Sequence, residues 1–476
     1  MTGGLTQLLF VGSQDILLKF NPEITYFKKV YRTHSNFSME SIRVELNRSD
    51  ANIYNNTTYK LKIPRHADLI AQIYLVVTLP DIVSDNILGF RWVENIGEAL
   101  INNYYITIGG NKIDMQTGDF IHAVNQLSLN KDKRDLYDNL TGNVMQLNNP
   151  DQYMLTHNNL SKPPIRYRIG QSYPTVAQPI NIKYGDEDNF TPSIPSRTIY
   201  VPLYFWFNRE IGNALPLISL QYSEVEVTIE LNPLNTLYKV FYNIDNVQDY
   251  YAPSTFITAH QLHNFVTNVR MNSLVSNTVV DIKAAAEINF IYLDTIERNY
   301  FAYKPLEYLI EQVTRIEHNN LAANNIISLI LQNPVKELIW YCRRDNVNVK
   351  NDWFDFTDVD GGNIMKTAKI MFNGFDRFDS KPVEYFNWLQ PFQHHSANSK
   401  PGLMCYSFAI DPENYQPSGS VNMSRINNIQ FNMTVKQPRL LLNENVSNYN
   451  YDAVFFAINY NFLTIASGLG GVKFSS

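Results

Sequence analysis

The sequence predicts an all-β protein built from sandwiches or barrels, with a few short helices in its loops. Tyrosine and phenylalanine are abundant, at 30 and 27 of 476 residues, and aromatic side chains favour strands. Charged residues make up only 18% of the chain, below the usual share of roughly a quarter, so much of the surface is polar and uncharged. Short segments rich in β-branched and aromatic residues recur between Gly, Pro, Asn and Asp, as expected for many short strands.

The clearest strand patterns are spread over the whole chain. They lie at 67–80, 104–114, 224–232, 284–294, 335–343, 367–374, 402–410, 428–435 and 454–467. Segment 224–232 alternates strictly, which is typical of a strand with one wet face. Its expected core side chains are Val225, Val227, Ile229 and Leu231, and its expected outward side chains are Glu224, Glu226, Thr228 and Glu230.

Helical periodicity is confined to short stretches. In "RWVENIGEALINN", Trp92, Ile96 and Leu100 are spaced four apart, which fits one amphipathic helix. "FIHAVNQLS" and "PVEYFNWLQPF" are two further helix candidates. Many strands with so little helix indicate a sandwich or barrel architecture.

The chain also contains an internal repeat. When the sequence is aligned with itself, one offset, called the long shift below, places Asp119 opposite Glu384 and Phe120 opposite Tyr385. The same offset aligns segment 73–75 with 338–340. One shift that serves two separate segments indicates two copies of one β unit. A second, short shift pairs Pro216 with Pro417, Ser219 with Ser420, Val225 with Ile426 and Ile229 with Phe431.

The difference between the two shifts implies an insertion in the first copy, at about 131–197. This segment is polar and rich in proline, and loops of that length are usually functional or exposed. We expect it to be a long exposed loop of the first unit. The boundary between the two units is expected between 235 and 253.

The bulk properties exclude several classes of protein. The net charge of -6 argues against a general nucleic-acid binder, which needs a basic face. Cys342 and Cys405 are expected to be buried thiols in a reducing compartment. We expect neither a signal peptide nor a membrane-spanning segment. Asn-x-Ser/Thr triplets at Asn139, Asn159 and Asn189 carry little weight without a secretory route.

Candidate catalytic and metal-binding residues are weak. The pair His394-His395 lacks further ligands at the spacing of a zinc site. "FTDVDGGN" places Phe356 and Thr367 where a calcium loop requires carboxylates. The acid pairs Asp355/Asp358 and Asp376/Asp379 could serve a glycosidase, although solvated turn acids are the commoner origin of such pairs. We therefore predict no catalytic residue, no metal site and no cofactor, as suits a structural protein.

Five stretches are more distinctive than these motifs. They include "YVPLYFWFNREIGNALPLISLQYSEVEVTIEL" at 200–231 and "FNGFDRFDSKPVEYFNWLQPFQHH" at 372–395, and the others lie at 21–42, 406–428 and 456–471. Together, and in order, they resemble the major capsid proteins of the nucleocytoplasmic large DNA viruses, a double jelly-roll family. The insertion at 131–197 resembles the family least.

The resemblance implies two tandem eight-stranded jelly-roll sandwiches. It divides the chain into an N-terminal arm at 1–37, a first jelly roll at 38–235 and a second jelly roll with a C-terminal tail at 236–476. It further implies a homotrimer that forms a pseudo-hexagonal capsomer and tiles an icosahedral shell. The implied location is the virion, after assembly in the host cytoplasm.

Two groups of contact residues follow from the resemblance. An arm beneath the shell would contact neighbouring capsomers or minor capsid proteins near an inner membrane, through Tyr26, Phe27, Lys28, Lys29, Tyr31 and Arg32. The other interpretation of this cluster is the charged face of the first strand. The second group is an intersubunit loop formed by Ala214, Leu215, Pro216, Leu217 and Ile218.

Two alternative functions stay open on the sequence. A paralogous minor capsomer or assembly scaffold of the same virus would share the fold. A jelly-roll carbohydrate-binding protein or glycoside hydrolase would need exposed aromatic residues and a carboxylate pair. Surface glycans are compatible with the capsid role, whereas sequence-specific nucleic-acid binding is not expected.

Overall fold

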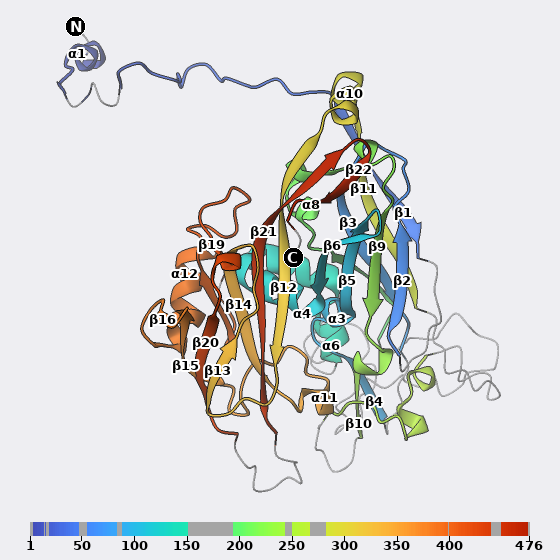
Figure 1. The fold of residues 1–476 in the computed structure, drawn as a ribbon. Helices are drawn as coiled ribbons and strands as arrows, with labels where there is room; N and C mark the ends of the chain where they lie inside the picture. The colour runs from blue at the N-terminus through green and yellow to red at the C-terminus, as the bar shows by residue number, and fades with distance from the viewer. Residues whose placement is uncertain are drawn as a thin grey trace.

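The computed structural model describes residues 3–13, 15, 19–46, 55–82, 88–150, 194–242, 250–266, 282–397, 399–438 and 449–474. It contains two β-sandwiches that lie side by side, the first in blue and green and the second in orange and red (Figure 1). Each sandwich packs two antiparallel sheets of four main strands against each other. The predicted all-β class with few and short helices is confirmed.

The first sandwich has one sheet in the order β1-β11-β3-β7 and a second in the order β2-β9-β5-β6, and β8 adds to the edge of β3. Its strands are β1 (Phe37–Glu45), β2 (Thr57–Lys62), β3 (Leu69–Leu79), β5 (Ile101–Ile108), β6 (Asn111–Thr117), β7 (Arg197–Pro202), β8 (Leu215–Pro216), β9 (Val225–Leu231) and β11 (Lys283–Leu293). A separate pair joins β4 (Leu88–Trp92) to β10 (Tyr238–Tyr242).

The second sandwich repeats this arrangement, with sheets in the order β12-β21-β14-β18 and β13-β20-β15-β16. Shorter strands β19, β22 and β17 add to β14, β21 and β15. The strands are β12 (Leu306–His318), β13 (Asn324–Ser328), β14 (Pro334–Arg344), β15 (Met365–Phe372), β16 (Phe375–Asp376), β17 (Lys381–Pro382), β18 (Leu403–Ser407), β19 (Val421–Asn422), β20 (Ile429–Val435), β21 (Tyr451–Ala466) and β22 (Leu469–Val472).

The two strand orders are those of a jelly roll, and they correspond strand for strand. The long shift matches β3 to β14, so the predicted duplication is confirmed. The short shift is slightly wrong, because β9 begins at Val225 and β20 begins at Ile429. Ile229 therefore corresponds to Met433 and not to Phe431.

One strand crosses the predicted boundary between the sandwiches. β11 lies at 283–293, in the segment assigned to the second unit, yet it pairs with β1 and β3 of the first. The first sandwich therefore extends to Leu293. The sequence pattern indicated the strand correctly but carries no information on its pairing partner.

One helix precedes the first strand, and the others occupy connections between strands. The helices are α1 (Gly3–Leu9), α3 (Ile96–Ala99), α4 (Gly118–Ser128), α5 (Lys131–Thr141), α6 (Met145–Asn148), α8 (Trp206–Arg209), α10 (Thr295–Tyr303), α11 (Val347–Lys350) and α12 (Gln390–His394), with a π-helical turn η7 (Tyr385–Leu389) and several 3-10 turns. None of those described is long and apolar enough to cross a membrane. Helix α5 begins the predicted insertion, and 151–193 lie outside the described residues.

The predicted helix around Trp92 is only one turn long. Trp92 ends β4, and Asn95 adopts a left-handed backbone with φ of 51° that separates the strand from α3. The other two predicted helices form as α4 and as η7 with α12. In β9, Thr228 is buried together with the four expected core residues, because the strand lies between β2 and β5.

Each sandwich has its own hydrophobic core, and a third cluster joins the two. Trp340 is fully buried in the second core, with its ring centroid 5.2 Å from that of Phe386 and 4.9 Å from that of Phe431. The joining cluster places α4 of the first sandwich against the outer face of the β12-β21-β14-β18 sheet. Figure 1 shows α4 between the two sandwiches.

Candidate assembly surfaces

The N-terminal segment extends away from the body of the molecule (Figure 1). Tyr26, Phe27 and Tyr31 are 90%, 99% and 84% exposed, and Lys28, Lys29 and Arg32 are exposed as well. Because β1 begins at Phe37, this cluster precedes the first strand, and its interpretation as a charged strand face is wrong. Aromatic side chains held in water in this way favour contact with another surface.

The predicted intersubunit loop lies inside its own chain. Ala214, Leu215, Pro216 and Leu217 are buried, and only Ile218 is half-buried. β8 pairs with β3, and the turn that follows it contacts α10. The predicted intersubunit loop is therefore wrong, because these side chains already pack against their own strand and helix and leave little apolar surface for a second subunit.

An exposed apolar surface lies instead on η7 and α12. Trp388, Leu389 and Phe392 are 65%, 42% and 86% exposed, and they border a hollow of ≈ 730 Å³. The sequence indicated a helix here and a resemblance to the capsid family, but not a contact surface. The alignment of this segment with α4 under the long shift was the signal that could have marked it as a contact surface.

The contact between the two sandwiches shows what such a helix can do. Phe120, Ala123, Val124 and Leu127 of α4 are all buried against β14, β18 and β21. The ring centroid of Phe120 lies 5.4 Å from that of Phe456 in an edge-on arrangement. Burial of these apolar side chains contributes about 1.5–3 kcal/mol for each large one.

Polar contacts fix the position of α4 on the second sandwich. The Asp119 carboxylate accepts hydrogen bonds from Arg315 Nε at 3.2 Å and from the Tyr341 hydroxyl at 2.8 Å. At the end of the helix, the Ala397 amide donates to the Leu127 carbonyl at 3.0 Å. These groups specify the docking register because a shift of the helix would leave them unpaired.

A buried cluster of charges lies at the same junction. Glu311 of β12 binds both Arg209 of the first sandwich and Lys336 of β14, whose Nζ also donates to the Pro412 carbonyl at 2.8 Å. Burial opposes the charge on Glu311, but Arg209 and Lys336 outweigh it and hold the pKa of this carboxyl below its usual value. The cluster therefore ties the two sandwiches through paired charges.

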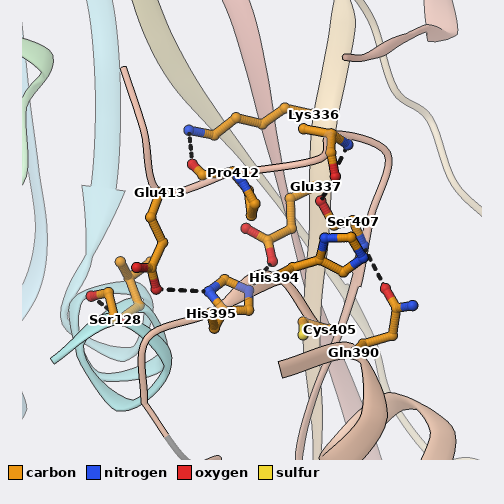
Figure 2. Close-up of polar contacts among 12 residues, drawn as sticks. Ser128, Lys336, Glu337, Gln390, His394, His395, Cys405, Ser407, Pro412 and Glu413 are labelled. Atoms are coloured by element: carbon orange, nitrogen blue, oxygen red, sulfur yellow. Dashed lines mark hydrogen bonds and ion pairs between the residues drawn. The ribbon is translucent and has the colours of Figure 1, made fainter. Parts of the chain in front are cut away.

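The histidine pair forms local hydrogen bonds in the second sandwich, and His395 is part of an ionic cluster. His395 Nε2 lies 2.5 Å from Glu337 and Nδ1 lies 3.1 Å from Glu413, with the His395 side chain only 4% exposed (Figure 2). Burial disfavours the imidazolium, but the carboxylate of Glu337 outweighs it and raises the pKa of His395 to about 12. His394 is more exposed and donates to the Ile410 carbonyl at 2.9 Å.

Glu337, His395 and Cys405 place their ligand atoms within 4.8 Å of one another, as a metal site would. Both imidazole nitrogens already bind carboxylates, and a protonated imidazole has no free lone pair. Burial also raises the pKa of Cys405 to about 11, so the thiol stays protonated at neutral pH. The arrangement suits an ionic cluster that fixes the 395–413 segment better than it suits a metal ion.

Three of the four acids considered for glycoside hydrolysis are engaged in other contacts. Asp355 pairs with Arg344 at 2.6 Å, and Asp376 pairs with Lys369 at 3.0 Å. Asp358 accepts a hydrogen bond from the Tyr451 hydroxyl at 2.8 Å. Phe356, the first position of the weak calcium motif, is 3% exposed and stacks on Tyr341. These contacts are structural.

Comparison with known proteins identifies the family to which this double-sandwich chain belongs. A family model described as the large eukaryotic DNA virus major capsid protein matches residues 297–471, and one described as the major capsid protein N-terminus matches 25–294. The chain belongs to the major capsid protein family of large eukaryotic DNA viruses. The division between the two models falls where β11 ends, in agreement with the strand pairing.

Two relatives in this capsid protein family match over their full length. The major capsid proteins of Phaeocystis pouchetii virus and Pyramimonas orientalis virus are 30% and 32% identical, and the alignments cover 100% of each chain. The VP54 structure of PBCV-1 covers 95% of this chain and 100% of its own, with 25% identity and a TM-score of 0.68. The Faustovirus major capsid protein, at 13% identity and a TM-score of 0.63, shares the fold.

Membership in the family confirms the resemblance, the double jelly-roll fold and the capsid function predicted from the sequence. Major capsid proteins of this family form the icosahedral capsid shell and are structural proteins rather than enzymes. The virion shell is accordingly the location of the protein. The surfaces that matter are therefore those that bind other subunits.

Proposed function

We propose that the chain self-associates as a homotrimer whose six sandwiches form a pseudo-hexagonal capsomer. The observation that supports this best is the pair of sandwiches with matching strand order, held side by side by α4. Three such chains around one axis provide six similar wedges, which can meet six neighbours in a shell. A cyclic arrangement also closes the contacts and leaves no open-ended fibre.

The arm is proposed to bind partners beneath the shell. Tyr26, Phe27 and Tyr31 supply apolar anchors, and Lys28, Lys29 and Arg32 supply charge for neighbouring capsomers or minor capsid proteins near an inner membrane. Assembly in the host cytoplasm and glycans on the outer surface belong to the same proposal, and sequence-specific nucleic-acid binding does not.

The trimer is tested by the mass of the purified protein in light scattering at micromolar concentration. We expect three times the 55.0 kDa of one chain. A stable monomer under these conditions would refute the proposed capsomer.

The arm is tested by deleting residues 1–34, which end before β1 at Phe37. We expect the shortened protein to form trimers of normal mass but to fail in shell assembly with the minor capsid proteins. Loss of the trimer itself would contradict the proposed role of the arm, because the arm would then belong to the capsomer.

A further inference from the structure

The contact between the two sandwiches uses four positions of α4. Phe120, Ala123, Val124 and Leu127 cover the outer face of the second sandwich, while Ile121 on the other side of the helix is fully buried and belongs to the core of the first. The helix therefore has one face for its own sandwich and one for the neighbouring sandwich.

In the corresponding segment of the second sandwich, three of the same four positions are exposed and the fourth is half-buried. Under the long shift, Ile121 corresponds to Phe386, which is also fully buried in its own core, so the two helices share one register. The four contact positions correspond to Tyr385, Trp388, Leu389 and Phe392. These side chains range from half-buried to 86% exposed. An apolar surface of this kind marks an interaction site.

The receiving face is repeated as well. In the second sandwich, α4 covers a sheet in which four residues on neighbouring strands pair side by side and so form a row across the strands. This row consists of Arg315, Phe456, Ile339 and Cys405. The strand registers of the first sandwich give the corresponding row, which consists of Arg43, Glu287, Tyr74 and Pro202. All four residues of this second row are half-buried or exposed in the single chain.

The arginine that begins each row is matched, whereas Glu287 of the first sandwich stands where the second has Phe456. Asp119 of α4 binds Arg315, and Arg315 also pairs at 2.8 Å with Glu317, its next neighbour but one along β12. In the first sandwich, Arg43 pairs in the same way with Glu45 at 2.9 Å. Asp119 corresponds to Glu384 under the long shift, so the acid that would meet Arg43 is present on the exposed helix.

One substitution within the rows is compensated. Within the chain, Phe120 of α4 packs on Phe456. At the proposed contact, Tyr385 takes the place of Phe120 and Glu287 takes the place of Phe456. A phenol hydroxyl can donate a hydrogen bond to a carboxylate, so the exchange of both residues keeps the two surfaces complementary.

We propose that η7 and α12 of one subunit dock on the outer face of the β1-β11-β3-β7 sheet of a second copy, with Glu384 paired to Arg43. This contact between subunits has the same arrangement as the contact that α4 makes with the second sandwich within one chain. This inference rests on the proposed trimer and names the surface that holds it together. Since the contact joins two different surfaces, it is heterologous, and it closes into the proposed ring when successive subunits are related by one third of a turn.

The charge pair gives the sharper test. Glu384→Arg and Arg43→Glu each place like charges together, and we expect each to raise the trimer dissociation constant by about tenfold or more. The double variant E384R/R43E reverses the pair and is expected to restore most of the affinity. Single variants that dissociate like the wild type, or a double variant no tighter than the singles, would overturn the proposed pairing.

The apolar surface is tested with Trp388→Asp combined with Phe392→Asp. We expect monomers of 55.0 kDa with an unchanged circular dichroism spectrum, because both side chains are exposed in the single chain. Ile326→Asp is the matched control, since Ile326 is 68% exposed on β13 at the opposite edge of the same sandwich, and it should remain trimeric. A trimeric double variant overturns this interface but leaves the trimer standing, whereas a monomeric wild type refutes the trimer itself.

Discussion

Replacement of His395 by alanine is expected to lower the free energy of unfolding of the second sandwich by about 3–5 kcal/mol. The side chains of His395 and Glu337 are 4% and 3% exposed, so removal of the imidazolium leaves a buried carboxylate without its counter-charge. Glu413 loses its partner as well, although its side chain is 23% exposed and regains water. The expected loss of unfolding free energy therefore comes mainly from the unpaired carboxylate of Glu337.

Calorimetry on the purified protein measures this effect. For a domain of about 150–250 residues, each kcal/mol corresponds to about 2–4 °C, so the transition of the second sandwich should fall by about 6–20 °C. His394→Ala is the matched control, because His394 donates a hydrogen bond to the Ile410 carbonyl, which is worth about 1 kcal/mol.

A second substitution tests the cause of the effect. Glu337→Gln in the H395A background removes the stranded charge and should recover part of the lost stability. Equal melting temperatures for H395A and H394A, or no recovery in the double variant, would refute the description of this cluster as a paired buried charge.

Three further predictions concern the core, a turn and pH. Trp340→Ala removes a fully buried ring and should cost about 3–5 kcal/mol in denaturant unfolding; a cost below about 1 kcal/mol would contradict the packing. Gly402→Ala should lower the melting temperature, because φ is +89° and the added Cβ would lie 2.1 Å from the Phe356 carbonyl oxygen; an unchanged value would argue against this backbone. Burial raises the pKa of Asp114 from 3.8 to about 7, so the folded state keeps a proton that the unfolded state loses, and stability declines by about 4 kcal/mol as pH rises from 4 to above 7. Asp114→Asn should flatten this decline in unfolding curves measured at several pH values, and an equally steep decline in the variant would assign it to other groups.

Local patterns predicted the strands well because each strand is bounded by residues with definite backbone preferences. The segment at 104–114 is an instructive case, since it forms two strands, β5 and β6, joined at Gly109 and Gly110. Both glycines have positive φ, at 58° and 82°, as a two-residue hairpin turn requires, and the Gly-Gly pair was the available signal. The internal repeat was also visible because it depends on sequence alone.

Features that depend on distant partners were not predictable from one sequence. The burial of Leu215 and Leu217 follows from pairing with β3 and packing near α10, neither of which is a local property. The cluster of Glu337, His395 and Glu413 joins segments that lie far apart in the sequence, so the histidine pair looked isolated. Its acids come from a strand and a loop that only the fold brings together.

The position of β11 has a consequence for synthesis of the chain on the ribosome. β11 lies between β1 and β3, and β21 lies between β12 and β14, so each sandwich receives a central strand near the end of its own segment. A fragment that stops at residue 235 would expose the edges of β1 and β3, and we expect it to aggregate in light scattering. Neither sandwich can close its sheet early, so an unfinished chain has no complete face to offer a growing shell.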